Sequence, residues 1–269
     1  MATMTEPQVK TLVRYRVEDG LALIELDDPP ANTYTHEMMR QLDDAILQAR
    51  FDDAAHVIVL RGTGDKFFSA GANISYLNSI TPRYKYFFCL HANETLNRLE
   101  QTPKLVIAAL NGHCVGGGLE IAMAADIRIA KRNAGKLGLP EVTRGVLPGT
   151  GGTQRMARLV GKARAIEMMA TGSTFSFEDG LAMGLVNHVF ETEDFDAKVL
   201  EYAKQFLPPN KASKAVGRIK RSVQSGCDLS LEAGLAIERE LQQQLFQSED
   251  AKEGLTAYNE KRMPEFKGR

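Results

Sequence analysis

The 269-residue sequence lacks the marks of several classes of protein. Its three cysteines, Cys89, Cys114 and Cys227, do not have the paired spacing of a metal site. An odd number of cysteines, in a chain whose first ten residues are polar and carry no apolar signal-peptide core, predicts reduced thiols. We therefore expect a cytoplasmic protein without a bound metal.

Net charge and hydropathy argue against two kinds of large partner, nucleic acids and membranes. The formal net charge is −1, so the chain has no overall attraction for nucleic acid or for an anionic membrane surface. No apolar run approaches the roughly 20 residues that a membrane-spanning helix requires. We expect neither a nucleic-acid partner nor a membrane partner.

The hydrophobic content of 43% and charged content of 25% are typical of a soluble globular protein. Short apolar runs at Val13–Arg16 and Leu21–Leu26 predict two strands, and the helical spacing of apolar residues over Glu37–Phe51 predicts a helix. His56–Leu60 predicts a buried strand. This order of two strands and a helix recurs as far as Leu105, so we predict an α/β protein built from a repeated β-β-α unit.

The last quarter of the chain has a different pattern, because it predicts helices almost throughout. Four are expected, over residues 195–207, 212–223, 231–246 and 251–262. The change near Thr192 predicts two parts, a core of residues 1–192 that holds the active site and a helical region of residues 193–269.

The chemistry is concentrated between Val106 and Arg155. A predicted strand over Leu105–Leu110 and a turn lead to three glycines, Gly116–Gly118, which open a predicted helix over Leu119–Ala125. The first turn of a helix has unpaired N–H groups, so the N–H near Gly117 is available to an anionic oxygen. Glu120 follows in an apolar run, where ionisation is costly, and we expect its pKa to be perturbed.

Each of these features also has a purely structural interpretation. In that interpretation the glycines serve only close strand–helix packing, and Glu120 lies at the surface or in a salt bridge. Gly62–Ile74 is predicted to be a loop, and the glycines of Gly149–Gly152 either present N–H groups or simply allow packing. A phosphate-binding loop is disfavoured, because no Gly-Lys-Ser/Thr follows the three glycines.

Five segments together resemble the enoyl-CoA hydratase/isomerase family, the crotonase superfamily, in the family's order and over nearly the whole chain. They are Phe68-Ser69-Ala70-Gly71-Ala72-Asn73-Ile74, Asn111-Gly112 with Gly116-Gly117-Gly118-Leu119-Glu120, Ala125-Asp126-Ile127-Arg128-Ile129-Ala130, Gly138-Leu139-Pro140-Glu141, and residues 147–155, which read Leu-Pro-Gly-Thr-Gly-Gly-Thr-Gln-Arg.

The resemblance implies a crotonase-type spiral of β-β-α units, with C-terminal helices that assemble the protein into trimers or into hexamers made of two trimers. It implies that the backbone N–H groups of Ala72 and Gly117 form an oxyanion hole and that Glu120 and Glu141 are the catalytic acid and base. The substrate-binding residues that it implies are Ala70, Asn73, Ile74, Gly116 and Pro140. Coenzyme A is then the carrier part of an acyl-CoA substrate, and no separate cofactor is expected.

The activity implied is that of a lyase of fatty acid metabolism, which hydrates a 2-enoyl-CoA to a 3-hydroxyacyl-CoA. The alternatives are an enoyl-CoA isomerase, another crotonase-fold acyl-CoA enzyme such as a decarboxylase, hydrolase or ring-opening enzyme, and a non-enzymatic scaffold or RNA-binding homologue that keeps the fold. The presence of both Glu120 and Glu141 favours hydration over isomerisation. Asn73 stands where many members of the family carry Asp, which leaves its contact with coenzyme A open.

Overall fold

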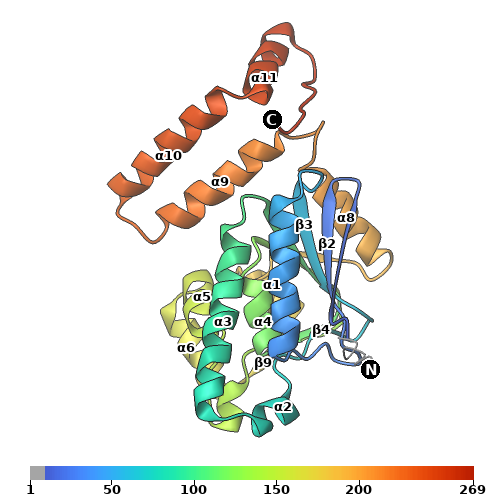
Figure 1. The fold of residues 1–269 in the computed structure, drawn as a ribbon, viewed down its shortest axis with the longest axis vertical. Coiled ribbons are helices and arrows are strands. Elements are labelled where there is room, and N and C mark those ends of the chain that lie inside the picture. The colour runs from blue at the N-terminus through green and yellow to red at the C-terminus, as the bar shows by residue number, and fades with distance from the viewer. Residues whose placement is uncertain (1–9) are drawn as a thin grey trace, which may run out of the picture.

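The computed structural model describes residues 10–269 and shows an α/β protein with two sheets and a helical C-terminal region (Figure 1). The polar segment Met1–Lys10, on which the signal-peptide argument depends, falls almost entirely on residues 1–9, outside the described residues. No helix within residues 10–269 has both the length and the apolar character that crossing a membrane requires.

The first sheet has six strands in the order β1-β2-β3-β5-β7-β10. β1 and β2 form an antiparallel hairpin, and the remaining pairs are parallel. The strands are β1 Val13–Glu18, β2 Leu21–Leu26, β3 Val57–Gly62, β5 Leu105–Leu110, β7 Ile127–Lys131 and β10 His188–Phe190.

The second sheet has four short strands in the order β4-β6-β8-β9. They are β4 Phe67–Ser69, β6 His113–Val115, β8 Lys136–Gly138 and β9 Thr174–Ser176. Along the chain, β3, β5 and β7 of the first sheet are each followed directly by a strand of the second. The chain therefore spirals between the two sheets, and the predicted β-β-α repeat is confirmed.

Helices follow the strand pairs. They are α1 His36–Phe51, α2 Ile74–Ser79, α3 Pro82–Gln101, α4 Gly117–Met123, the 3₁₀ helix η1 Glu141–Arg144, α5 Gly152–Val160, α6 Lys162–Thr171, α7 Phe177–Ala182, α8 Phe195–Lys204, α9 Ser213–Gly226, α10 Leu231–Phe246 and α11 Glu249–Glu260. Side-chain caps define where the main ones begin: Thr35 accepts a hydrogen bond from the N–H of Met38 before α1, and Thr81 from that of Tyr84 before α3.

The core lies on both faces of the first sheet, because alternate strand residues point to opposite faces. On β2, Ala22 and Ile24 belong to the larger cluster, which α1, α3 and α4 complete. Leu21 and Leu23 belong to a second cluster, covered by α8. α1 and α3 lie side by side over the first face (Figure 1). Because helices pack on both faces of the sheet, the carboxyl ends of its parallel strands are held in place.

Beyond α8 the chain forms a long pair of helices, α9 and α10, which extends away from the sheets (Figure 1), with α9 in contact with α3 and β5. A buried ion pair of 2.8 Å between the Nζ of Lys220 on α9 and the carboxylate of Asp126 ties this pair to the core. The predicted division at residues 192/193 stays a prediction; α8, which it assigns to the helical region, contributes its buried side chains to the core.

Several boundaries differ from the sequence-based expectation. The predicted loop over Gly62–Ile74 contains β4, since a three-residue strand has no detectable periodicity. The sequence pattern predicts one helical region over Asn78–Glu100, whereas the structure has two helices there, α2 and α3, because Thr81 and Pro82 start a new one. No helix was predicted over α6, and the apolar run Leu185–Val189 predicts a strand, whereas the observed strand β10 spans His188–Phe190.

Candidate active site

A cavity of about 450 Å³ opens where α4, η1, α2 and α3 approach one another. Eight of the nine predicted site residues line it: Ala70, Ala72, Ile74, Gly116, Gly117, Glu120, Pro140 and Glu141. The ninth, Asn73, lies beside the cavity without lining it. The fold therefore brings together residues that are up to 71 positions apart in the sequence, from Ala70 to Glu141.

Glu120 is buried on α4, with only 2% of its surface exposed. Its Oε1 accepts hydrogen bonds of 2.7 Å from the backbone N–H groups of Thr150 and Gly152. A Cβ atom at position 152 would lie 2.9 Å from that oxygen, so a glycine is needed there. The glycines of this loop thus present N–H groups, and the interpretation of Glu120 as a surface residue is wrong.

The pKa of Glu120 is raised to about 7, chiefly because burial disfavours the charged form. The two backbone N–H groups favour the carboxylate and lower the pKa, while the negative charge of Glu141 raises it. The sequence predicted a perturbed pKa without its direction, and the direction is upward. Both protonation states of Glu120 are populated near neutral pH, which suits a group that exchanges protons.

This raised pKa makes a prediction about stability. A buried carboxyl that ionises at 4.5 when unfolded and at about 7 when folded stabilises the native state at low pH, and this contribution is lost as the pH rises through 7. Glu120→Gln keeps an acceptor for both N–H groups and removes the titration. We expect the unfolding free energy of the variant, relative to wild type, to grow by roughly 2–3 kcal/mol between pH 5 and pH 8.

Urea unfolding at the two pH values measures this difference. The exposed Glu94 lies on α3 and makes no ion pair or side-chain hydrogen bond within residues 10–269, so Glu94→Gln is the matched control. A Glu120→Gln difference that stays constant with pH would show that Glu120 titrates as an ordinary carboxyl.

Glu141 is the first residue of η1 and directly follows Pro140. Its Oε2 is buried and has no hydrogen-bond partner within residues 10–269. Burial raises its pKa, opposed by its own backbone N–H and by the positive charges of Arg144 and Lys85. A Cβ atom at position 116, where φ is +56°, would lie 3.0 Å from its other oxygen, Oε1. Gly116 therefore leaves room for this carboxyl at the cavity.

The N–H of Ala72 makes no hydrogen bond within residues 10–269, although its neighbours do. The N–H of Gly71 donates to Ser69 Oγ at 3.1 Å, and that of Asn73 donates to the carbonyl of Tyr34 at 3.0 Å. The segment is thus held at both sides of Ala72. A single backbone donor remains free in a residue that lines the cavity.

Gly117 offers a second free donor, because it is the first residue of α4 and has no intrahelical acceptor. Its N–H makes no hydrogen bond to any residue from 10 to 269. A Cβ atom at Gly71, whose φ is +86°, would lie 2.7 Å from the Gly117 nitrogen. The segment that carries Ala72 therefore approaches the start of α4 closely, which only glycine at position 71 permits.

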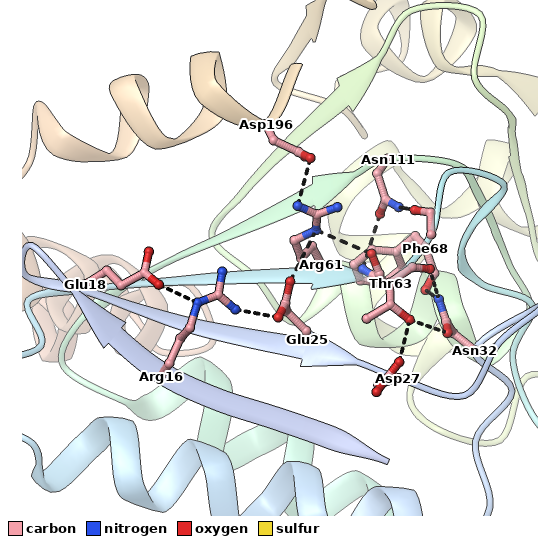
Figure 2. Close-up of polar contacts among 12 residues, drawn as sticks. Arg16, Glu18, Glu25, Asp27, Asn32, Arg61, Thr63, Phe68, Asn111 and Asp196 are labelled. Atoms are coloured by element: carbon pink, nitrogen blue, oxygen red, sulfur yellow. Dashed lines mark hydrogen bonds and ion pairs between the residues drawn. The ribbon is translucent and has the colours of Figure 1, made fainter. Parts of the chain in front are cut away.

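Asn32 is fully buried, with an exposed fraction of 0%, and it holds the chain that leads to Ala72. Its side-chain nitrogen donates to the carbonyls of Thr63, Phe67 and Phe68 at 2.9, 3.1 and 3.3 Å, and Figure 2 shows this network. The backbone carbonyl of Asn32 accepts a hydrogen bond of 2.7 Å from the Ser69 hydroxyl. Hydrogen bonds between Asn32 and residues 63–69 therefore hold in place the chain that leads to Ala72.

Asn73 has a local structural task. Its side-chain oxygen accepts a hydrogen bond of 2.9 Å from the N–H of Tyr76 and so caps α2, and its nitrogen donates to Thr33 Oγ1 at 3.3 Å. Aspartate caps helices equally well, so asparagine at this position preserves the start of α2. The predicted contact of Asn73 with substrate stays a prediction.

The lining residues that the sequence analysis did not assign to the site include Tyr34, Lys85 and Thr150. Lys85 lies on α3 with its Nζ 5.1 Å from the centre of the Phe88 ring, and makes no ion pair within residues 10–269. Thr150 was visible only as part of a glycine-rich loop. Tyr34 had no local signal, because its hydroxyl partner, Thr150, is 116 residues away.

Comparison with known proteins identifies the family. The sequence model of the family described as enoyl-CoA hydratase/isomerase matches residues 16–269. A probable enoyl-CoA hydratase of Bacillus subtilis (strain 168) is 37% identical over 255 residues, which cover 94% of this chain and 97% of the relative. A short-chain-enoyl-CoA hydratase of Clostridium acetobutylicum is 37% identical over 254 residues, 94% and 96% of the two chains.

A solved structure gives the same result. The crystal structure of an enoyl-CoA hydratase from Geobacillus kaustophilus HTA426 matches with a TM-score of 0.94 at 45% identity, and the match covers 97% of this chain and 98% of the other. The two-sheet spiral and the match of the family model over almost the whole chain lead to one conclusion: the chain belongs to the enoyl-CoA hydratase/isomerase family.

Proposed function

We propose that this protein adds water across the double bond of a 2-enoyl-CoA thioester and forms a 3-hydroxyacyl-CoA. The observation that carries the proposal is one cavity with two carboxyl groups of raised pKa, Glu120 and Glu141, beside the unbonded N–H groups of Ala72 and Gly117. The names of the relatives, an enoyl-CoA hydratase and a short-chain-enoyl-CoA hydratase, support it.

The oxygen of the thioester is the atom on which negative charge develops. As the water oxygen bonds to the β carbon, the π electrons of the double bond move onto the α carbon and the thioester oxygen, which gives an enolate. The N–H groups of Ala72 and Gly117 act as its oxyanion hole, because fixed donors in a site with little water stabilise such charge. The enolate then returns its electrons to the α carbon, which takes up a proton.

The two carboxyl groups move the protons. One accepts a proton from the attacking water, and the other delivers a proton to the α carbon, so the pair returns to its starting charge after proton exchange. Burial raises the pKa of Glu120 to about 7, so this carboxyl can exchange a proton near neutral pH, and burial also raises the pKa of Glu141. The proposed chemistry requires no separate cofactor, and coenzyme A is part of the substrate.

An enoyl-CoA isomerase is the second candidate, because it uses the same enolate. Moving a double bond requires the oxyanion donors and one main base, whereas hydration requires two proton-transfer groups and a water molecule. Glu120 lines the cavity, and the N–H groups of Thr150 and Gly152 both donate to its Oε1 rather than to its Oε2. The presence of this second carboxyl favours hydration.

The discriminating experiment follows absorbance with two purified substrates. Crotonyl-CoA, a 2-enoyl thioester, loses its conjugated absorbance on hydration, and a 3-enoyl-CoA gains it on isomerisation. We expect the first reaction to have the larger kcat/KM. Faster turnover of the 3-enoyl-CoA would make the isomerase the better description, and no turnover of 2-enoyl-CoAs of several lengths would contradict the hydratase.

We also propose that the chain assembles into trimers, or into hexamers of two trimers. Its C-terminal helices expose several large apolar side chains, among them Ile219 and Val223 on α9 and Leu231 and Leu235 on α10. Such a patch favours burial against another copy. Light scattering during size-exclusion chromatography should give three or six times the chain mass of 29.6 kDa, and a stable monomer would contradict the proposal.

A further inference from the structure

Tyr34 belongs by its backbone to the segment that carries the Ala72 donor. It lies between the β1–β2 hairpin and α1 and forms an isolated parallel bridge with Ala72. Its N–H donates to the carbonyl of Gly71 at 3.0 Å, and its carbonyl accepts from the N–H of Asn73 at 3.0 Å. These bonds use the groups on either side of Ala72 and leave the Ala72 N–H free for the cavity.

The side chain of Tyr34 runs to the other half of the site. It is 2% exposed and packs edge-on against the Phe88 ring, with ring centres 5.8 Å apart. Any Cβ atom at Gly117 would overlap the Tyr34 ring. The hydroxyl lies 3.0 Å from Thr150 Oγ1. The residue therefore touches the start of α4 and the loop that holds Glu120.

Thr150 completes the link to the acid. Its backbone N–H donates to Glu120 Oε1 at 2.7 Å, while its side chain pairs with Tyr34. We propose that Tyr34 is a positioning residue that couples the oxyanion donor to the acid: its backbone sets Ala72, and its hydroxyl, through Thr150, sets Glu120. The inference rests on the proposed hydration and assigns a role in it to a residue outside the two carboxyls and two donors.

The state of the Tyr34 hydroxyl suits this role. Burial, followed by the negative charge of Glu120, raises its pKa above the ordinary value of a tyrosine, so the hydroxyl keeps its proton. The backbone N–H groups of Gly152 and Thr150 lower the pKa of Glu120, as does the positive charge of Lys85. A loop freed from Tyr34 holds these N–H groups less firmly, and the pKa of Glu120 rises further.

Two variants remove the link from opposite ends. Tyr34→Phe keeps the ring and deletes the hydroxyl, and Thr150→Val keeps the N–H to Glu120 and deletes Oγ1. We expect each to lower kcat for crotonyl-CoA by roughly 3- to 10-fold, the worth of one hydrogen bond, with a smaller change in KM. The double variant should lose no more than either single one, because both break the same contact.

Tyr76→Phe is the control. The Tyr76 hydroxyl donates to Tyr84 at 3.2 Å, and Tyr76 does not line the cavity, so its removal tests the loss of a tyrosine hydroxyl as such. We expect its kcat to equal that of wild type. A drop as large as that of Tyr34→Phe would overturn the inference, since it would reveal a general effect on the fold.

A second readout does not depend on turnover. The Glu120 carboxyl can be titrated by ¹³C NMR in wild type, Tyr34→Phe and Thr150→Val, with Glu120→Gln to assign the signal. The ionisable groups that face it are Tyr34, Lys85 on α3 and Glu141 on η1. We expect both variants to raise the pKa of Glu120 and the acid limb of the kcat–pH profile to move with it.

The two proposals fail separately. Absent hydration in wild type contradicts the proposed function, while the NMR titration still decides the coupling between Tyr34 and Glu120. An unchanged Glu120 titration in both variants, or additive losses of kcat in the double variant, would overturn the positioning role even in an active hydratase.

Discussion

Glu141→Gln should lower kcat for hydration of crotonyl-CoA by about 10²- to 10⁴-fold, the usual contribution of a general acid or base. Glutamine has nearly the same size, so it fills the same place at the start of η1 but cannot exchange a proton. Because Glu141 Oε2 is buried with no partner in residues 10–269, the substitution breaks no hydrogen bond of that oxygen. The protein should therefore fold normally and bind the substrate with a much smaller change.

Glu120→Gln should produce a loss on the same scale. Its amide oxygen still accepts the N–H groups of Thr150 and Gly152. If both carboxyls act on one water molecule, the double variant should be only slightly slower than either single variant, because the loss of one carboxyl already disables the pair. Glu94→Gln, a change at an exposed carboxyl on α3, should retain full activity.

The pattern of losses distinguishes the two candidate reactions. Near-normal hydration by Glu120→Gln, with none by Glu141→Gln, would contradict the two-acid assignment and favour a single-base isomerase. Normal turnover in both variants would place the active site outside this cavity.

Ala72→Pro is the second change with a large expected effect, because it deletes the proposed oxyanion donor itself. Proline has no N–H, and loss of one oxyanion donor typically costs about 10²- to 10³-fold in kcat. Ala72 already carries a Cβ atom, its N–H makes no bond within residues 10–269, and the preceding residue is glycine. The change therefore removes little from the native structure besides the donor.

Ala72→Ser is the matched control, since it changes the side chain and keeps the N–H. It should retain activity within a few-fold of wild type. Circular dichroism and thermal unfolding of Ala72→Pro should show a native fold, so that the loss of kcat reports on the donor. A folded Ala72→Pro protein with wild-type kcat would show that the enolate is stabilised elsewhere.

Sequence patterns predicted those parts of the fold that have a long periodic signal. Helix α1 buries a regular face and strand β5 is a continuous apolar run, so both were recognised. The second sheet was missed because three-residue strands such as β4 and β6 carry no period. Their pairing depends on contacts between distant segments, which no local pattern records.

The same difference between local and distant contacts separates the site residues that were predicted from those that were not. Glu120 was recognised because a carboxylate in an apolar helix is costly without partners, and that argument needs only its neighbours in sequence. Its partners, the N–H groups of Thr150 and Gly152, are 30 and 32 residues away. Tyr34 was invisible to the same reasoning, since a lone tyrosine before a helix is ordinary and its importance arises only when the chain has folded.

The most direct test of the proposed hydration is to run the reaction in isotopic water and measure the mass of the product. Purified protein is incubated with crotonyl-CoA in water enriched in ¹⁸O, and separately in D₂O, and the product is analysed by mass spectrometry. Hydration predicts 3-hydroxybutyryl-CoA with one ¹⁸O at carbon 3 and one deuterium at carbon 2. Deuterium uptake into an enoyl-CoA without any ¹⁸O, or no isotope uptake at all, would contradict the account.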